Sequence, residues 1–160
     1  MHNDLPEILM AEDSADDAEL TMGALEEYNL ANRLVLVSDG AEALDYLYRR
    51  GRYTGRVGAN PIFFLLDLKM PKVSGLEVLR HMKQTAELAD IPVVMLSSSC
   101  EELDLRKAQE LGASAYVVKP VRFQDFVEAV KTIGRFWGVL NVLRPAGIDT
   151  AQTITPADQS

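Results

Sequence analysis

One stretch of this chain decides its fold: Pro61-Ile62-Phe63-Phe64-Leu65-Leu66-Asp67-Leu68-Lys69-Met70-Pro71. Its five consecutive apolar residues, 62–66, are typical of a strand that is buried on both faces in the middle of a parallel sheet. Asp67 ends this run, and Met70 and Pro71 mark the loop beyond it. Because burying a lone charge is costly, we expect the Asp67 carboxylate to point from the carboxyl edge of the sheet into a crevice, where open α/β sheets bind ligands.

The composition is that of one soluble globular domain, with 160 residues of which 48% are apolar and 25% are charged. A formal net charge of −8 argues against broad binding to nucleic acids or anionic membranes. The single cysteine, Cys100, excludes an intrachain disulfide and fits a reducing compartment. The first residues do not resemble a signal peptide, and no apolar run approaches the roughly 20 residues of a membrane span. We therefore expect a cytoplasmic protein without a membrane anchor.

Apolar runs on either side of the central stretch predict four further buried strands, at residues 7–11, 34–37, 91–96 and 115–118. Helical patterns lie between the strands. The first helix is predicted from a cap at Asp13 or Ser14 to about residue 28, and the others cover residues 40–47, 76–83 and 101–111. This alternation predicts an α/β fold with a doubly wound, five-stranded parallel sheet, in the flavodoxin-like order 2-1-3-4-5.

The final helix, predicted from about residue 123 to residue 143, carries more apolar residues than packing on one sheet requires. Five of them alternate by four and three positions, as in a two-helix seam: Phe126, Val130, Ile133, Trp137 and Leu140. A wider core stripe would also explain the pattern, but apolar residues nearly encircle the last turns. We therefore expect a homodimer built on this helix. The domain would span residues 1–144, and the polar residues 145–160 would form a tail.

Polar residues follow the carboxyl ends of four different predicted strands: Glu12 and Asp13, Asp67, Ser97, and Lys119. In the predicted strand order the first and third strands are neighbours, so three carboxylates would share one crevice. Like charges at that range require a cation, and hard oxygen ligands with open positions suit Mg²⁺. The sequence therefore predicts a magnesium site at this edge of the sheet.

The same four positions predict phosphoryl transfer. Asp67 would attack phosphorus and carry an acyl phosphate, while Mg²⁺ bridges Asp13, Asp67 and the incoming group. Lys119 would pair with Asp67 beforehand and then bind one phosphoryl oxygen, and the Ser97 hydroxyl would bind another. Taken singly, these residues are a turn aspartate, a helix start, a loop hydroxyl and a solvated lysine. Their common edge and consistent order favour the chemical interpretation.

At this point the sequence resembles the receiver domain of two-component response regulators, over about residues 7–139. The matching motifs are Met10-Ala11-Glu12-Asp13, Leu65-Leu66-Asp67-Leu68-Lys69-Met70-Pro71, Ser74-Gly75, Met95-Leu96-Ser97-Ser98 and Val117-Val118-Lys119-Pro120. The resemblance implies that Asp67 is the phosphoacceptor, that Glu12 and Asp13 form the acidic Mg²⁺ site and that Ser97 is the switch hydroxyl. It also implies the Lys69 backbone carbonyl as a metal ligand, a cis Lys119-Pro120 bond, and Tyr116 as an aromatic switch residue that turns inward when Ser97 moves.

Three features resemble the small stand-alone regulators that receive phosphate from phytochrome-type sensor histidine kinases. They are residues 13–20, the connector 49–60 with its four arginines, and the long final helix with Phe136-Trp137. The sixteen residues after Arg144 cannot form a DNA-binding module, so we expect output through protein binding, dimerisation or phosphate relay rather than direct DNA binding. With this net charge, the arginines are expected to form a solvated or kinase-docking loop. Lys69 departs from the side chain of many family members, which affects the expected hydrolysis rate.

Three alternatives compete with this interpretation. A phosphatase of the haloacid dehalogenase type also uses an aspartate nucleophile, but its second aspartate two residues later is Lys69 here. A stand-alone phosphorelay intermediate could serve a kinase unrelated to phytochromes. A flavodoxin-like nucleotide binder would need a glycine-rich phosphate loop, which does not appear. We expect no enzymatic activity beyond self-phosphorylation from phosphodonors and slow self-dephosphorylation.

Overall fold

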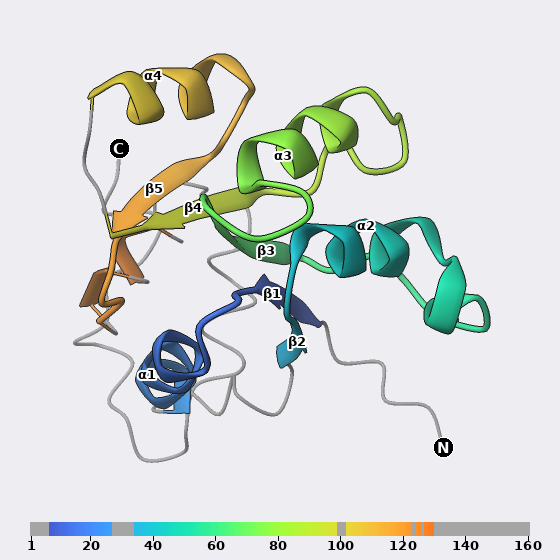
Figure 1. The fold of residues 1–160 in the computed structure, drawn as a ribbon, viewed down its shortest axis with the longest axis horizontal. Helices are drawn as coiled ribbons and strands as arrows, with labels where there is room; N and C mark the ends of the chain where they lie inside the picture. The colour runs from blue at the N-terminus through green and yellow to red at the C-terminus, as the bar shows by residue number, and fades with distance from the viewer. Residues whose placement is uncertain (1–6, 27–33, 99–101, 123, 126, 130–160) are drawn as a thin grey trace, which may run out of the picture.

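The computed structural model describes residues 7–26, 34–98, 102–122, 124–125 and 127–129. Within these ranges the chain forms a five-stranded parallel sheet in the order β2-β1-β3-β4-β5, as predicted (Figure 1). Its strands are β1 (Ile8–Ala11), β2 (Leu34–Val37), β3 (Phe63–Asp67), β4 (Val93–Ser97) and β5 (Ala115–Val118). The register pairs Ala11 with Leu66, Asp67 with Leu96 and Ser97 with Val118, so that the carboxyl ends of four strands meet at one edge.

Helices connect the strands: α1 (Ala15–Leu25), α2 (Gly40–Tyr48), the short 3-10 helix η3 (Gly51–Tyr53), α3 (Gly75–Lys83) and α4 (Glu102–Glu110). Three of the α-helices begin with a side-chain cap, because Ser14, Asp39 and Ser74 each accept a hydrogen bond from the amide three residues later. Residues 124–125 and 127–129 are helical, at the start of the predicted final helix. All five residues predicted for the dimer seam lie outside the described residues.

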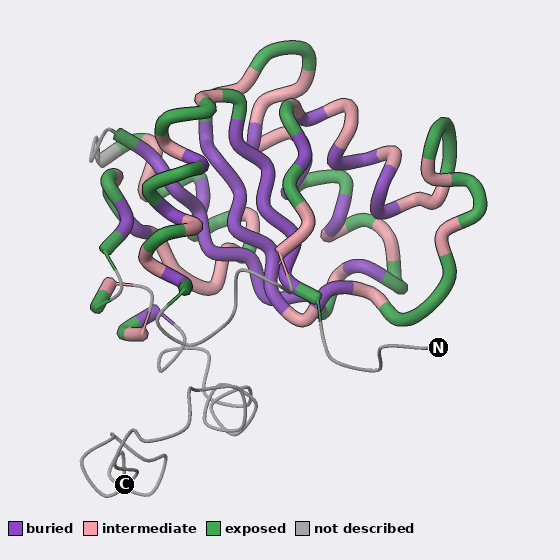
Figure 2. The backbone as a smooth tube through the Cα atoms, turned by 90° about the horizontal axis from the view of Figure 1, so that it is seen from below, coloured by how far each residue is buried: buried purple, intermediate pink, exposed green. Residues whose placement is uncertain are grey.

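The sheet is covered on both faces (Figures 1 and 2). Residues of β1 and β3 alternate between the two layers, with Leu9 and Phe64 on the side of α2 and α3, and Met10 and Leu65 on the side of α1. The fully buried β3 burial pattern confirms that the central stretch is a core strand. Among the described residues no helix is both long and apolar enough to cross a bilayer.

The expectation that residues 34–37 and 115–118 form fully buried strands was wrong. Strands β2 and β5 are the two ends of the sheet that the described residues form, and each has a neighbouring strand on one side only. In β5 only Val117 is buried, and Val118 is 44% exposed. Leu34 and Val35 are half-buried, Leu36 is 42% exposed and only Val37 is buried. An apolar run therefore indicated the strand correctly but did not indicate its position in the sheet.

The arginine-rich connector 49–60 is largely a structural element. Arg49 donates hydrogen bonds to the carbonyls of Arg56 and Gly58, both at 2.6 Å. The Arg56 guanidinium lies 4.1 Å from the centre of the Tyr46 ring, and its Nε donates to the Tyr46 carbonyl at 2.9 Å. Arg52, by contrast, has a largely exposed side chain. Arg50 also binds α2, because its Nε donates to Asp45 Oδ1 at 2.8 Å. Arg49, Arg50 and Arg56 thus hold the connector against α2.

Candidate functional site

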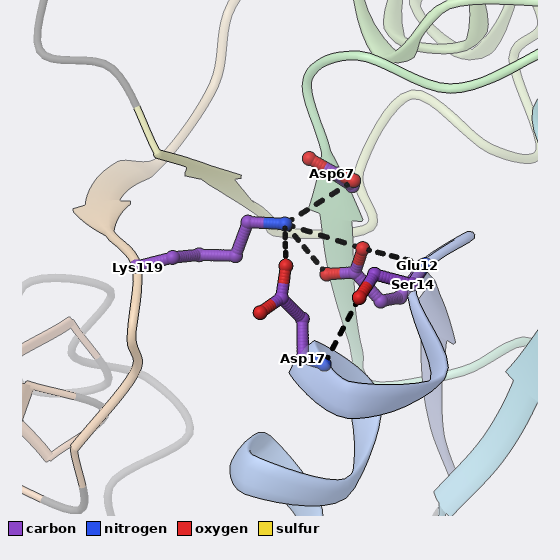
Figure 3. Close-up of polar contacts among 5 residues, drawn as sticks. All are labelled: Glu12, Ser14, Asp17, Asp67 and Lys119. Atoms are coloured by element: carbon purple, nitrogen blue, oxygen red, sulfur yellow. Dashed lines mark hydrogen bonds and ion pairs between the residues drawn. The ribbon is translucent and has the colours of Figure 1, made fainter.

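The carboxyl edge of the sheet brings together the polar residues that follow β1, β3, β4 and β5 (Figure 3 draws Glu12, Asp67 and Lys119). Glu12 follows β1 and donates its amide hydrogen to the Val37 carbonyl at 3.0 Å. Asp67 and Ser97 are the last residues of β3 and β4. Lys119 follows β5, and its amide donates to the Ser97 carbonyl at 2.7 Å. The four residues therefore lie together at the carboxyl edge of the sheet.

The Lys119 ammonium is the centre of this cluster. Its Nζ lies 3.0 and 3.2 Å from the two Glu12 oxygens, 2.9 Å from Asp17 Oδ2 and 3.4 Å from Asp67 Oδ2. Burial by itself would lower the pKa of Lys119, but hydrogen bonds to Asp17 and Glu12, together with the charge of Asp67, raise that pKa above its usual value. The lysine therefore stays charged and compensates the buried carboxylates.

Asp67 is more deeply buried than the sequence indicated, with only 4% of its surface exposed. The expectation of an open carboxylate treated Asp67 as a lone charge, although the sequence also predicts Lys119 as its partner, and the structure shows that ion pair. Burial, followed by the hydrogen bond and charge of Glu12, raises the pKa of Asp67 from 3.8 to about 7, against the opposing effect of Lys119. The Lys119 ammonium thus offsets only part of the effect that burial and Glu12 have on the pKa of Asp67.

Glu12, Asp13 and Asp67 form an acidic group whose ligand oxygens lie within 4.8 Å of one another. Glu12 and Asp67 are buried, whereas Asp13 is exposed at the mouth of the site. Carboxylate oxygens at this spacing fit a small, hard divalent cation with one side open to solvent. The raised pKa of Asp67 agrees with a site that lacks one positive charge in the protein alone.

The loop after Asp67 is held by two close backbone approaches. A Cβ atom on Gly75 would lie 2.1 Å from the Asp67 carbonyl oxygen, and one on Gly40 would lie 1.9 Å from the Val73 carbonyl oxygen. The Gly75 amide also donates to the Leu68 carbonyl at 2.8 Å. Glycine at both positions lets α2 and α3 pack directly against the turn that contains Lys69.

Ser97 and Tyr116 lie on the two strands beside the acidic group. Ser97 is 2% exposed, and Tyr116 is half-buried on β5 opposite Met95. The Tyr116 side of β5 and helix α4 border a groove of about 380 Å³, which is also lined by Leu105, Arg106, Ala108 and Gln109. The Lys119-Pro120 bond is cis, as the resemblance implied.

Asp17 is the residue of this site that sequence reasoning missed. It lies in the first turn of α1, where the positive end of a helix favours an acidic side chain without any specific contact. The available signal was its place one turn after Glu12-Asp13, because α1 starts at the same edge of the sheet. Only the tertiary contact with Lys119 distinguishes it from its exposed neighbour Asp16.

Comparison with known proteins decides the family: the family of response regulator receiver domains matches residues 8–131. This chain belongs to that family. Phosphorylation on an aspartate with Mg²⁺ is general for receiver domains, and the chain is homologous to phytochrome response regulators. The predicted fold and family are both confirmed.

Three relatives illustrate the similarity. The structure of the bacteriophytochrome response regulator RtBRR is 53% identical with a TM-score of 0.78, over 88% of this chain and 85% of that one. The probable methanogenesis regulatory protein FilR2 of Methanothrix harundinacea is 40% identical, over 81% of this chain and 82% of the relative. Response regulator Rcp1 of Synechocystis is 35% identical over 81% and 87%. A structure of the Mn²⁺-bound form of Rcp1 has a TM-score of 0.68 at 34% identity, covering 88% of this chain and all of that one.

Replacing Asp67 by Asn should stabilise the metal-free protein at high pH. Because the folded-state pKa of Asp67 is about 7 and its usual value is 3.8, ionisation penalises the folded state progressively as pH rises between these values. Asn carries no charge, so we expect its free energy of unfolding to exceed that of the wild type by about 1–3 kcal/mol at pH 8. The difference should approach zero near pH 4. Urea unfolding in EDTA across this range measures it, and an Asp67→Asn protein less stable than wild type at pH 8 contradicts the assignment.

Proposed function

We propose that this receiver domain accepts a phosphoryl group on Asp67 from a sensor histidine kinase and signals through protein–protein interaction. One observation carries the proposal. The Asp67 carboxylate lies 3.4 Å from the Lys119 ammonium and within 4.8 Å of oxygens from both Glu12 and Asp13. Asp67 thus has a nearby ammonium that can bind a phosphoryl oxygen, and nearby carboxylate oxygens that can bind a metal ion.

In the proposed reaction an Asp67 oxygen forms a bond to phosphorus while the bond from phosphorus to the donor breaks, and the donor leaves with the bonding electron pair. The Lys119 ammonium donates a hydrogen bond to one phosphoryl oxygen, and the Ser97 hydroxyl donates to another. Glu12, Asp13, Asp67 and the Lys69 backbone carbonyl would hold a divalent cation, which we propose is Mg²⁺. When bound, the cation supplies charge neutralisation for the carboxylates and the phosphoryl oxygens. The Mn²⁺-bound form of Rcp1 supports a divalent ion.

We further propose that Ser97 and Tyr116 report the state of Asp67. The Ser97 carbonyl accepts the Lys119 amide hydrogen, so a shift of Ser97 toward a phosphoryl group would act on the end of β5. Tyr116 lies three residues earlier on the same strand and borders the groove beside α4. Inward rotation of its ring would change the shape of that groove for a protein partner.

We propose a phytochrome-type histidine kinase as the phosphodonor, in the cytoplasm. The support is the 53% identity to a bacteriophytochrome response regulator. The alternative is a relay serving another kinase, because FilR2, which is 40% identical, is named as a probable methanogenesis regulatory protein. A haloacid dehalogenase-type phosphatase is disfavoured because Lys69 replaces its second aspartate. We propose self-phosphorylation and slow self-dephosphorylation as the chemistry of the chain.

The phosphoacceptor assignment predicts the site and the chemical type of the label. Wild-type protein incubated with Mg²⁺ and acetyl phosphate should gain the mass of one phosphoryl group, which hydroxylamine should remove because acyl phosphates react with it. Asp67→Asn should gain none, and Asp104→Asn on helix α4 is the matched control that keeps the label. Intact-protein mass spectrometry measures all three. A hydroxylamine-resistant label, or a label on Asp67→Asn, contradicts the proposal.

The kinase assignment predicts a preference in phosphotransfer. A panel of autophosphorylated histidine kinases, phytochrome-type and others, should transfer radiolabelled phosphate to the chain at different rates. We expect phytochrome-type kinases to be faster by about 10-fold or more, because specificity is a difference between binding free energies. Asp67→Asn should receive no label from any of them. Faster transfer from another kinase class would support the relay alternative instead.

We also propose the homodimer that the apolar pattern of the final helix predicts. A stable interface should hold two chains together at a protein concentration of roughly tens of micromolar, so light scattering should give twice the mass of one chain. A protein with both Ile133→Glu and Trp137→Glu should be monomeric, since buried carboxylates in an apolar seam are costly. The matched control Lys131→Glu should remain dimeric. A monomeric wild type rules the proposed seam out.

A further inference from the structure

Lys119 contacts one carboxylate that the proposed metal site does not use. Of its three carboxylate partners Asp17 is the nearest, with Oδ2 at 2.9 Å from Nζ, followed by Glu12 at 3.0 Å and Asp67 at 3.4 Å (Figure 3). The acidic group that could hold a metal ion contains Glu12 and Asp67 but not Asp17. Within the part of the chain that the structure describes, Asp17 therefore serves Lys119 rather than the cation.

The position of Asp17 is set by the local structure at the start of α1. Its amide donates to the Ser14 hydroxyl oxygen at 3.2 Å, and the Ser14 amide donates to Glu12 Oε2, also at 3.2 Å. Through Ser14, the helix cap thus connects the Glu12 carboxylate with the backbone of Asp17, and both residues bind Lys119. Because the cap is a short-range feature of the chain, both carboxylates are in place before any phosphodonor binds.

The number of N–H donors on the Lys119 ammonium explains how Asp17 can affect the group beside Asp67. An ammonium has three N–H donors. When Glu12 and Asp17 occupy two of them, the third is directed toward Asp67, where a phosphoryl oxygen would lie. Glu12 is also a candidate metal ligand, so cation binding would draw on its oxygens. Asp17 is then the carboxylate that continues to hold the lysine in place.

We propose that Asp17 is a positioning residue for phosphoryl transfer, which acts by fixing the Lys119 ammonium beside Asp67. This inference rests on the proposed function of Asp67. Its alternative is that Asp17 contributes only its negative charge. The two roles predict opposite effects, because removing a negative charge favours an anionic donor, whereas releasing Lys119 slows transfer.

The test compares full-length wild type with Asp17→Ala, Asp17→Glu and the control Asp16→Ala. Asp16 is the adjacent exposed acidic residue of the same turn, so its replacement makes the same change in net charge. With Mg²⁺ and subsaturating acetyl phosphate, we expect Asp17→Ala to be phosphorylated about 10-fold more slowly than Asp16→Ala. Asp17→Glu should recover most of the rate, and calorimetry should give Mg²⁺ dissociation constants within about twofold of wild type for every variant.

Each outcome has a definite meaning. If Asp17→Ala reacts as fast as Asp16→Ala or faster, the inference is overturned, and so it is if slow transfer is accompanied by an equal loss of Mg²⁺ affinity. If Asp17→Ala does not fold by circular dichroism, Asp17→Asn, which keeps an accepting oxygen, replaces it and should react more slowly than Asp16→Asn. Failure of the proposed function looks different, because wild type itself would then carry no label on Asp67.

Discussion

The ion pairing of Lys119 with Glu12 and Asp67 is the interaction on which the rest of the site depends. Both carboxylates are almost completely buried, and a buried carboxylate without a partner would cost several kcal/mol. One ammonium reduces that cost but cannot cancel two negative charges, and Asp17 adds a third carboxylate to the same group. Burial, followed by the hydrogen bond and charge of Glu12, accordingly raises the pKa of Asp67. A site arranged in this way favours a divalent cation.

The fold brings these carboxylates together at one edge of the sheet. A parallel sheet places the carboxyl ends of its strands together, and the register aligns β1, β3, β4 and β5 at the same level. The close approaches at Gly40 and Gly75 then hold the following turn against the end of β3. Apolar packing on both faces of the sheet supplies the stabilisation that offsets the cost of the charged edge. The apolar residues that stabilise the domain therefore lie on the two faces of the sheet, whereas the charged residues of the site lie at its carboxyl edge.

Much of this was predictable from the sequence, because apolar runs and terminal polar residues are local signals. The central strand followed from such a run, whereas the strand order came from the flavodoxin-like pattern of alternating strands and helices. The common edge of Glu12, Asp67, Ser97 and Lys119 followed from the two together. The exposure of Leu36 did not, since a four-residue apolar run looks the same at the edge and in the centre of a sheet. The burial of Asp67 was also missed, because the cost of burying a lone carboxylate was applied to it although Lys119 was predicted as its partner.

Asp17 and the connector arginines were missed for a related reason. A helix dipole explains an acidic first turn, and net charge explains a solvated arginine loop, so neither pattern required a specific contact. In the structure Asp17 reaches an ammonium from β5, while Arg49 and Arg56 bind backbone carbonyls. Every residue has a backbone carbonyl, so the sequence does not indicate which carbonyl an arginine side chain binds. Such contacts become visible only when the chain path is known.

Lys119 connects the carboxylates of the site with the ends of β4 and β5. Its side chain contacts the carboxylates of β1, α1 and β3, while its amide is bound to the last residue of β4. In the proposed switch, a change of charge at Asp67 would alter the forces on the ammonium, and the hydrogen bond between the Lys119 amide and the Ser97 carbonyl would carry that change to the ends of β4 and β5. Tyr116 lies on β5 at the groove beside α4. The residue that compensates the buried charge thus directly follows the strand that borders this groove.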